Sequence, residues 1–360
     1  MRVAVLGGGH GCYAAAAELT ERGHDVWFWR RDAEAFQPLL EAKRITLTDS
    51  RGRREVEIHR PTTSIEEAVS QAELILTPLP ATAQEGMACA IAPFLRPGQI
   101  VFLPPGTFGS YLFARALRES GNRADVAFAE TGTLPNLVRK HGDTSIVVSA
   151  YGKHLPVGVF PSRSTWRAVK ILQAAYPSVQ PLEDVLSAAL MNAGPIIHPP
   201  LILMNAGPLE HFPAWDIHAE GTQPSIRRVT DGLDAERMAV REGLGYGPPH
   251  FPLRDHYAQE GPEWMYGRAA HEELTSSGDW REKIDLLSHR YMVEDTKLGL
   301  SLLTSVGKWA GVETPIARGL LAIASAILGE DLYRTGRSLE ALGLATLTRG
   351  EMAQLLREGL

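Results

Sequence analysis

Residues 1–130 alternate short apolar runs with stretches in which apolar residues recur every three or four positions. Strand-like runs, rich in β-branched and aromatic residues, occur at Val3–Leu6, Asp25–Arg30, Leu74–Leu79, Ile100–Leu103 and Val126–Glu130, and a helical pattern follows the first of them at Tyr13–Arg22. Most of these runs lie between glycine or proline residues. Alternation of strands and helices predicts a doubly wound parallel sheet.

Two segments of this part have a different pattern. Residues 44–59 and 136–159 contain paired strand-like runs, such as Ser145–Ser149, with turn residues between them. We interpret them as antiparallel additions to the parallel core.

Beyond Ser162 the strand pattern ends and helical patterns take over. Predicted helices are Trp166–Tyr176, Asp234–Gly243, Asp295–Gly311, Pro315–Leu328 and Ser338–Leu342, and Gly245–Pro252 is a predicted loop rich in glycine and proline. A chain of 360 residues suits two domains of ordinary size. We predict an α/β domain of Rossmann type at residues 1–180 and an all-helical domain at residues 181–360.

Charge and composition narrow the class of protein. The net charge is −6 and the arginines are scattered, which argues against a nucleic-acid partner. Cys12 and Cys89 are the only cysteines, so we expect no disulfide framework, no cysteine metal site and a reducing, cytoplasmic location. The N-terminus lacks a signal-peptide pattern, and apolar stretches such as Leu320–Leu328 are shorter than the roughly 20 residues that span a bilayer. We therefore expect no membrane association; a homodimer remains open.

A glycine-rich segment follows the first strand and opens the first helix. It reads Gly7-Gly8-Gly9-His10-Gly11-Cys12 and leads into an alanine-rich helical stretch. Gly7 would permit a tight turn, and Gly9 would let the backbone approach a pyrophosphate at the helix N-terminus. Cys12 replaces the third glycine of the usual fingerprint with a small residue. The segment predicts a dinucleotide site that includes Gly7, Gly9, His10, Gly11 and Cys12, the alternative being a plain glycine turn.

The end of the second predicted strand indicates which dinucleotide binds. Arg30 stands where an acidic residue would hold a ribose 2′-hydroxyl, and Arg31 and Asp32 follow it. A guanidinium pairs with phosphate, so we predict a preference for NADP(H), with Arg30 and Arg31 as ligands and NAD(H) still possible. The alternative is that both arginines are solvated and Asp32 binds the ribose.

His198 is the leading proton donor among the twelve histidines. Reduction of a carbonyl or imine by a nicotinamide needs such a donor, and histidine suits neutral pH. His198 lies in an apolar segment, Ile196–Leu203, where an imidazole needs a specific partner. A core histidine with purely structural bonds is the alternative.

Asp295 is the predicted partner. It lies on the apolar stripe of the helix formed by Leu298, Leu302, Val306 and Trp309, where a carboxylate is unfavourable unless paired. A histidine would satisfy it, and the pairing would set the tautomer and raise the basicity of the imidazole. We interpret Glu294 as a solvated charge. Arg290 could bind a substrate carboxylate through two hydrogen bonds, or form an i, i+4 pair with Glu294.

Together these residues resemble the opine dehydrogenase family. The resemblance covers most of the chain, and its strongest stretches are Asn192–Asn205, Glu220–Gly221 with Pro224–Ser225, Asp234–Arg237, Arg290–Tyr291 with Glu294–Asp295, and Gly336–Glu340 with Leu342–Leu344. It implies that His198 and Asp295 form a catalytic dyad and that Arg290 binds a substrate carboxylate. It further implies substrate contacts for Asn192 and Thr131 and a cofactor contact for Glu130.

The implied reaction joins the amino group of an amino acid to a 2-oxo acid, usually pyruvate, and reduces the imine with NADH or NADPH. Two positions depart from the family pattern: Gly194 stands where some relatives carry asparagine, and Arg30 ends the second strand. The candidate residues for the amino-acid pocket are Tyr257, Trp215 and Trp264. Two other functions are considered: a 2-oxo acid or 2-hydroxy acid reductase, and a dinucleotide-binding sensor without catalysis.

Overall fold

The computed structural model describes residues 1–256, 260, 263, 266–267 and 281–360. The chain forms two compact units, Met1–Ala189 with Gln354–Leu360, and Leu190–Ala353. This division differs from the predicted one at both ends of the second domain. The segment after residue 181 stays with the first unit because Asp184 packs directly on Gly158, where a side chain would collide with its carbonyl oxygen. The last residues return to the first unit, where Arg118 Nε donates to the Leu360 carbonyl at 3.0 Å.

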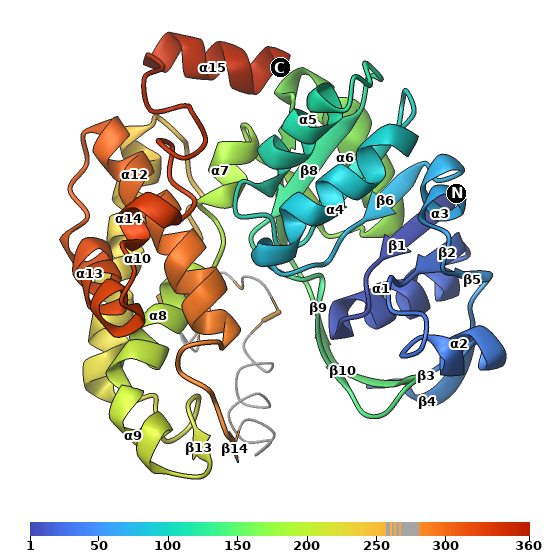
Figure 1. The fold of residues 1–360 in the computed structure, drawn as a ribbon, viewed down its shortest axis with the longest axis horizontal. Coiled ribbons are helices and arrows are strands. Elements are labelled where there is room, and N and C mark those ends of the chain that lie inside the picture. The colour runs from blue at the N-terminus through green and yellow to red at the C-terminus, as the bar shows by residue number, and fades with distance from the viewer. Residues whose placement is uncertain (257–259, 261–262, 264–265, 268–280) are drawn as a thin grey trace. The chain divides into compact units, whose positions relative to one another are not determined.

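The first unit contains two sheets and the helices that cover them (Figure 1). Its strands are β1 (Arg2–Leu6), β2 (Asp25–Trp29), β3 (Arg44–Asp49), β4 (Gly52–Glu57), β5 (Arg60–Thr62), β6 (Leu74–Leu76), β7 (Ile100–Leu103), β8 (Ala127–Thr131), β9 (Asn136–Lys140), β10 (Ser145–Tyr151), β11 (Leu155–Phe160) and β12 (Val179–Pro181). Its helices are α1 (His10–Glu21), α2 (Gln37–Ala42), α3 (Ile65–Ser70), α4 (Gln84–Ile91), α5 (Gly109–Glu119), α6 (Thr165–Ala175) and α7 (Val185–Ala189). A last helix, α15 (Arg349–Glu358), begins in the second unit and ends in the first, shortly before the C-terminal Leu360.

The main sheet has eight strands in the order β12-β11-β8-β7-β6-β1-β2-β5. All its pairings are parallel except β8 with β11. Strand β1 pairs with β2 on one side and with β6 on the other, so the order of connection reverses at β1. In open sheets of this kind, ligands bind beyond the carboxyl ends of the strands at such a reversal. The predicted Rossmann architecture is confirmed.

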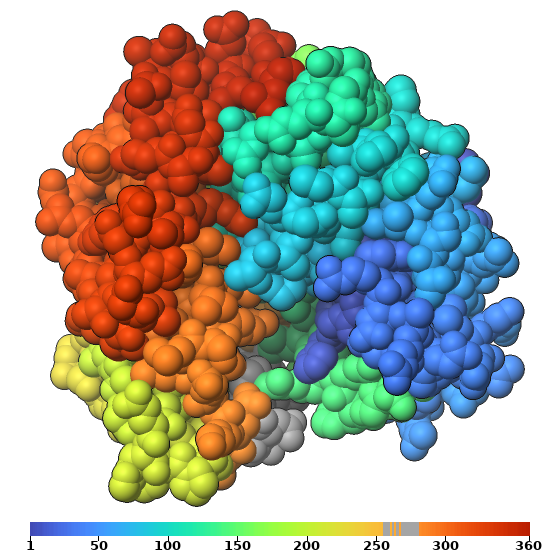
Figure 2. All heavy atoms as spheres, viewed as in Figure 1, coloured from blue at the N-terminus to red at the C-terminus, as the bar shows by residue number. Residues whose placement is uncertain are grey.

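The two segments predicted as antiparallel additions form most of a second sheet, ordered β4-β3-β10-β9. Pairs β3–β4 and β9–β10 are antiparallel, as expected, whereas β10 pairs with β3 in parallel and β11 joins the main sheet. In the space-filling view of Figure 2, the green surface of the β9–β10 region borders the blue surface of the β3–β4 region. Strand β11 is therefore an antiparallel addition to the core, as predicted, whereas β3, β4, β9 and β10 form a separate sheet of their own.

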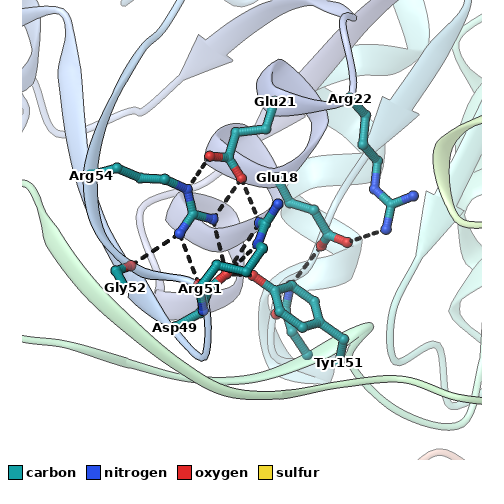
Figure 3. Close-up of polar contacts among 9 residues, drawn as sticks. Glu18, Glu21, Arg22, Asp49, Arg51, Gly52, Arg54 and Tyr151 are labelled. Carbon is teal, nitrogen blue, oxygen red and sulfur yellow. Dashed lines mark hydrogen bonds and ion pairs between the residues drawn. The ribbon is translucent and has the colours of Figure 1, made fainter.

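An ionic network holds this second sheet against helix α1 (Figure 3). The buried carboxylate of Asp49 accepts hydrogen bonds from Arg54, Arg51 and the Tyr151 hydroxyl, the last at 2.7 Å. Both arginines also bind Glu21 of α1. The hydrogen bonds from Arg54 hold the pKa of Asp49 well below its usual range, so this anchor weakens only in strong acid.

The second unit is predominantly helical. It contains α8 (Gly194–Met204), α9 (Ala206–His211), α10 (Pro224–Gly243), α12 (Ser301–Ala310), α13 (Pro315–Leu328) and α14 (Leu332–Thr335), a π-helix η5 (Tyr291–Leu300), and a short ladder of β13 (Trp215–Asp216) and β14 (Arg281–Glu282). The helix predicted from Asp234 begins ten residues earlier, at Pro224, where proline occupies the first turn. The helix predicted at Ser338–Leu342 is wrong, because these residues form turns.

Helix α10 organises the core of this unit through buried charges. Arg237 Nε binds Asp234 at 2.7 Å, and its other nitrogens donate to carbonyls of Leu190, His250 and Phe251. Glu236 accepts from the first backbone amides of α13, at Ile316 and Ala317. These residues of the family-like stretch Asp234–Arg237 are therefore structural.

One described segment, Val185–Met204, has the length and apolar composition of a membrane span. In its most apolar stretch of 18 residues, 83% of the stretch is buried inside the protein. Core packing accounts for the same composition, and the segment consists of the separate helices α7 and α8.

Candidate active site

The glycine-rich segment lies at the reversal point of the main sheet. Gly7 directly follows β1 and has a φ of +129°, a conformation that favours glycine. A Cβ there would lie 2.6 Å from Leu79, just beyond β6, and 2.8 Å from Cys12. The turn therefore needs glycine at this position, for the reason that the fingerprint implied.

The next residues shape an open helix N-terminus. Gly9 is the N-cap of α1, has no side-chain cap and has open space where a Cβ would stand. Its neighbour His10 begins the helix, and Gly11 packs against Leu134. Uncapped amides and the helix dipole favour an anion at such an end. The residues present fit a dinucleotide pyrophosphate.

Cys12 takes the place of the third glycine by filling space between the strands. Its thiol is fully buried and bonds to the carbonyl oxygens of Leu6 and Pro78, both at 3.7 Å. Burial raises the pKa of Cys12 to about 12, so the group stays a neutral thiol. Its role is packing between helix and sheet.

Arg30 lies directly against the glycine segment. A Cβ on Gly8 would lie 2.5 Å from Arg30 Nε, and Arg30 Nη1 donates to the Ala35 carbonyl at 3.0 Å. Asp32 is largely exposed and accepts a hydrogen bond from the Ala35 amide at 3.0 Å. Arg31 is exposed. Of Arg30, Arg31 and Asp32, which follow β2, only Arg30 contacts the glycine-rich segment.

Two further residues approach Arg30 that the sequence patterns did not reveal. Lys140, at the end of β9, has its Nζ 4.2 Å from the centre of the Tyr13 ring. Burial, assisted by the charge of Arg30, lowers the pKa of Lys140. The buried Tyr13 hydroxyl makes no hydrogen bond with good geometry to any described residue. No sequence signal could have found them, because only the folding of β9 onto α1 brings Lys140 close to Tyr13.

Glu130 and Thr131 end strand β8. The Glu130 carboxylate is fully buried and accepts hydrogen bonds from the Phe108 amide at 2.6 Å and the Ser110 amide at 3.0 Å. The carboxylate thereby caps the start of α5, and the Glu130 backbone lies within the sheet, opposite Leu103 of β7 and Gly158 of β11. The Thr131 hydroxyl is buried and has no hydrogen-bond partner within the described part of the chain.

In the second unit, His198 and Asp295 meet although 97 residues separate them. His198 lies in the middle of α8 and Asp295 in the π-helix η5, and the Nδ1 to Oδ2 distance is 2.7 Å. Both side chains are largely buried, at 13% and 8% exposure. With its Nδ1 hydrogen donated to the carboxylate, the imidazole keeps a lone pair on Nε2. This arrangement suits a general base.

Burial governs the ionisation of the pair. It lowers the pKa of His198, so the imidazole is neutral at neutral pH. Burial raises the pKa of Asp295 to about 7, and the nearby positive charge of Arg290 acts in the opposite direction. The pair therefore changes protonation within the physiological range, as a proton-transferring group requires.

The helix that carries Asp295 differs from the predicted α-helix Asp295–Gly311. Residues Tyr291–Leu300 form a π-helix, a rare conformation frequent at functional sites, and α12 follows it. Glu294 lies in this segment and is 7% exposed, so the prediction of a solvated charge was wrong. Arg290, just before the π-helix, is exposed.

Asn192 and Gly194 lie beside the dyad at the start of α8. The Asn192 side chain is buried, and its Oδ1 accepts a hydrogen bond from the Gly194 amide at 3.0 Å. A Cβ at Gly194 would collide with Asp295 Oδ1. Glycine at this position, which departs from the family pattern, therefore leaves the space that the carboxylate occupies.

The predicted pocket residues are only partly described. Tyr257 and Trp264 lie outside the described residues. Trp215 donates from its Nε1 to Asn205 at 3.1 Å and stacks on Phe212, contacts that hold the ladder region together.

Comparisons with known proteins identify relatives of both parts of the chain. Residues 181–328 match the model of the NAD/NADP octopine/nopaline dehydrogenase alpha-helical domain, and residues 3–125 match that of ketopantoate reductase PanE/ApbA. An opine dehydrogenase from Arthrobacter sp. (strain 1C) is 28% identical over 96% of both chains. Vitopine synthase from Allorhizobium ampelinum is 26% identical over 78% of this chain and 77% of its own.

Solved structures share the fold over nearly the whole chain. A complex of octopine dehydrogenase with NADH and agmatine superposes with a TM-score of 0.72, 19% identity, and coverage of 97% of this chain and 99% of that one. NADP+-bound yersinopine dehydrogenase gives a TM-score of 0.65 with 15% identity, over 99% and 98% of the two chains. The chain therefore contains the helical domain of octopine and nopaline dehydrogenases at residues 181–328, and it is similar over nearly its whole length to NAD(P)-dependent opine dehydrogenases.

Proposed function

We propose that this chain catalyses the NAD(P)H-dependent condensation of an amino acid with a 2-oxo acid to an N-(carboxyalkyl)amino acid, or the reverse oxidation. The observation that supports this proposal most directly is the hydrogen bond between His198 and Asp295, both of which lie in the matched helical domain. Related solved structures contain NADH with pyruvate or with L-arginine, which supports these two substrate classes.

The dyad supplies the proton transfers that the condensation needs. Neutral His198 takes a proton at Nε2 from the ammonium group of the amino acid, which frees the lone pair to attack the C2 carbonyl carbon. The imidazolium then returns a proton as water leaves the carbinolamine, while Asp295 stabilises its positive charge. The bound nicotinamide supplies the hydride that reduces the imine carbon.

The first experiment follows NADPH and NADH oxidation with pyruvate or another 2-oxo acid, with and without a pool of amino acids. The proposal predicts oxidation only when both substrates are present. Oxidation with the oxo acid alone would identify a simple reductase. Cofactor binding without turnover for any pair would identify a sensor.

The cofactor preference that we propose is NADP(H). Arg30 contacts the glycine loop, Lys140 lies close enough for the charge of Arg30 to affect it, and the buried Tyr13 hydroxyl lies nearby. Two cations of the same site repel each other, and a 2′-phosphate would offset that repulsion. Gly9 and the start of α1 would hold the pyrophosphate, and Thr131, with Glu130 beside it at the end of β8, would lie on the nicotinamide side. We also expect a cytoplasmic location, where Cys89 stays reduced.

Arg30→Gln is expected to weaken NADPH binding by about 10- to 100-fold, the range for one or two hydrogen bonds to a charged group. NADH affinity should change by less than about threefold. Calorimetric titration of both cofactors measures this, and the exposed neighbour Arg31→Gln serves as the matched control. Equal affinity of the unaltered protein for NADH and NADPH would refute the preference.

Arg290→Ala is expected to raise the KM for one carboxylate substrate by about 10- to 100-fold, with a smaller loss in kcat, because binding and orientation share the contact. Since Arg290 favours ionised Asp295, its removal should also shift the low-pH limb of activity to higher pH. Steady-state kinetics over pH measure both effects. Arg318→Ala, an exposed arginine of α13 paired with Glu313, is the control. Unchanged KM values for both substrates would remove Arg290 from substrate binding.

A further inference from the structure

Tyr291 packs face to face on the catalytic imidazole. The ring centres of His198 and Tyr291 are 3.7 Å apart, and their planes differ by 9°. Tyr291 is 4% exposed, so the contact is enclosed by protein. Asp295 fixes the position of Nδ1, but one hydrogen bond leaves the imidazole free to rotate about it. The stacked ring restricts that rotation.

Tyr291 is itself held from three directions. Its hydroxyl lies 2.8 Å from Nε2 of the buried His218, and its carbonyl accepts a hydrogen bond from the Thr296 hydroxyl at 2.7 Å. Its backbone amide approaches Nδ1 of His289 at 3.3 Å, and the His289 ring meets it edge-on. Such a set of contacts is more than packing alone requires of a core tyrosine, and it fixes the plane of the ring.

The stacked Tyr291 ring also affects the protonated form of His198. The face of an aromatic ring is negative, so Tyr291 stabilises the imidazolium that forms on His198 during the reaction. Among the described residues, the charged and titratable groups around His198, Tyr291 and Arg290 include Asp295, Glu294, His218, His289 and Tyr266. Arg290 opposes a positive charge on His198, whereas Asp295 and the ring of Tyr291 favour it.

We infer that Tyr291, held by His218, is a positioning residue that fixes the plane of the His198 imidazole and stabilises its protonated form during proton transfer. The expected changes in kcat rest on the proposed function. The expected change in the protonation of His198 does not, because it can be measured without substrate.

The test compares Tyr291→Leu, which removes the ring, with Tyr291→Phe, which keeps the stack and removes the bond to His218. Tyr291→Leu should lower kcat by about 10- to 100-fold and change the KM values by less than about threefold. Because the imidazolium loses a stabilising neighbour, the protonation of His198 should move to lower pH. Tyr291→Phe should lower kcat only a few-fold and leave the pH profile near its original position.

Two further measurements separate positioning from a purely structural role. In the Asp295→Asn background, Tyr291→Leu should have little additional effect on kcat, because both act through His198. NMR titration of the His198 ring in the protein without substrates should show the same downward shift. Tyr246→Leu, which removes a ring that faces Arg241, is the control for loss of an aromatic side chain in this unit.

The inference is overturned if Tyr291→Leu retains kcat or leaves the His198 titration unmoved, or if Tyr291→Phe lowers activity as strongly as Tyr291→Leu. Absence of turnover by the unaltered protein with every substrate pair would instead refute the proposed function. The NMR titration would still decide the effect on His198 in that case.

Discussion

Asp295→Asn should lower kcat by at least about a hundredfold while cofactor affinity stays within about twofold, the scale expected for a group that supports acid-base catalysis. The amide can still accept the hydrogen bond from His198 Nδ1, but it cannot stabilise the imidazolium. His198→Ala should reduce kcat to a similar level, because the two residues act as one unit. Stopped-flow and steady-state kinetics with saturating cofactor measure both.

The pH dependence gives this prediction a second readout. Burial raises the pKa of Asp295 to about 7, so the dyad takes up a proton as the pH falls through 7 and the base is lost. Activity in the direction of synthesis should therefore decline below about pH 7 in the unaltered protein. Asp295→Asn should lose this limb near pH 7, because its amide does not titrate.

The thermal stability of Asp295→Asn shows whether the variant is still folded. A carboxyl whose folded pKa lies above its unfolded value stabilises the fold below the unfolded pKa, and this contribution is lost as the pH rises through about 7. Above pH 7 the buried charge of Asp295 therefore opposes folding, and Asp295→Asn should unfold at the same or a higher temperature at pH 8. A stable variant with a kcat within tenfold of the original would show that the dyad is not the proton-transferring group.

Gly194→Ala should lower kcat by about 10- to 100-fold with a smaller effect on cofactor affinity. The added Cβ would collide with Asp295 Oδ1 and stand 3.3 Å from Asn192 Oδ1, so the carboxylate must rotate away from His198. Overpacking of this kind costs about 1–3 kcal/mol, enough to displace a hydrogen bond of ordinary strength. Measurement of kcat and of thermal unfolding separates lost geometry from lost fold.

Gly207→Ala is the matched control, because a Cβ on this glycine of α9 would meet open space. It should retain activity and gain slightly in stability from its helical position. If Gly194→Ala is as active as Gly207→Ala, the space beside Asp295 is not needed for catalysis. The asparagine carried at this position by members of the resembling family would meet the same obstacle in this chain.

The residues of the cofactor site show which features the local sequence can predict and which it cannot. Gly7 needs its positive φ and close packing for the reason that the fingerprint implies, and Cys12 fills the third position as a small buried residue. Local sequence contains this information because the strand, turn and helix are consecutive. Lys140 and Tyr13 could not be predicted, since they meet only when β9 folds onto α1.

By itself the sequence determined the alternation of strands and helices, the phosphate cradle and, by resemblance, the pairing of His198 with Asp295. The first two features depend on periodicity and on residue types at short spacing, which local chemistry reveals, whereas the pairing of two residues 97 positions apart came from the resemblance. Only the tertiary structure decided that Asp295 lies in a π-helix, that Glu294 is buried, that Gly194 leaves room for the carboxylate, and that Tyr291 stacks on the imidazole. Each depends on which side chains from distant segments share one enclosed space, and packing between elements, not the local pattern of any one of them, determines that.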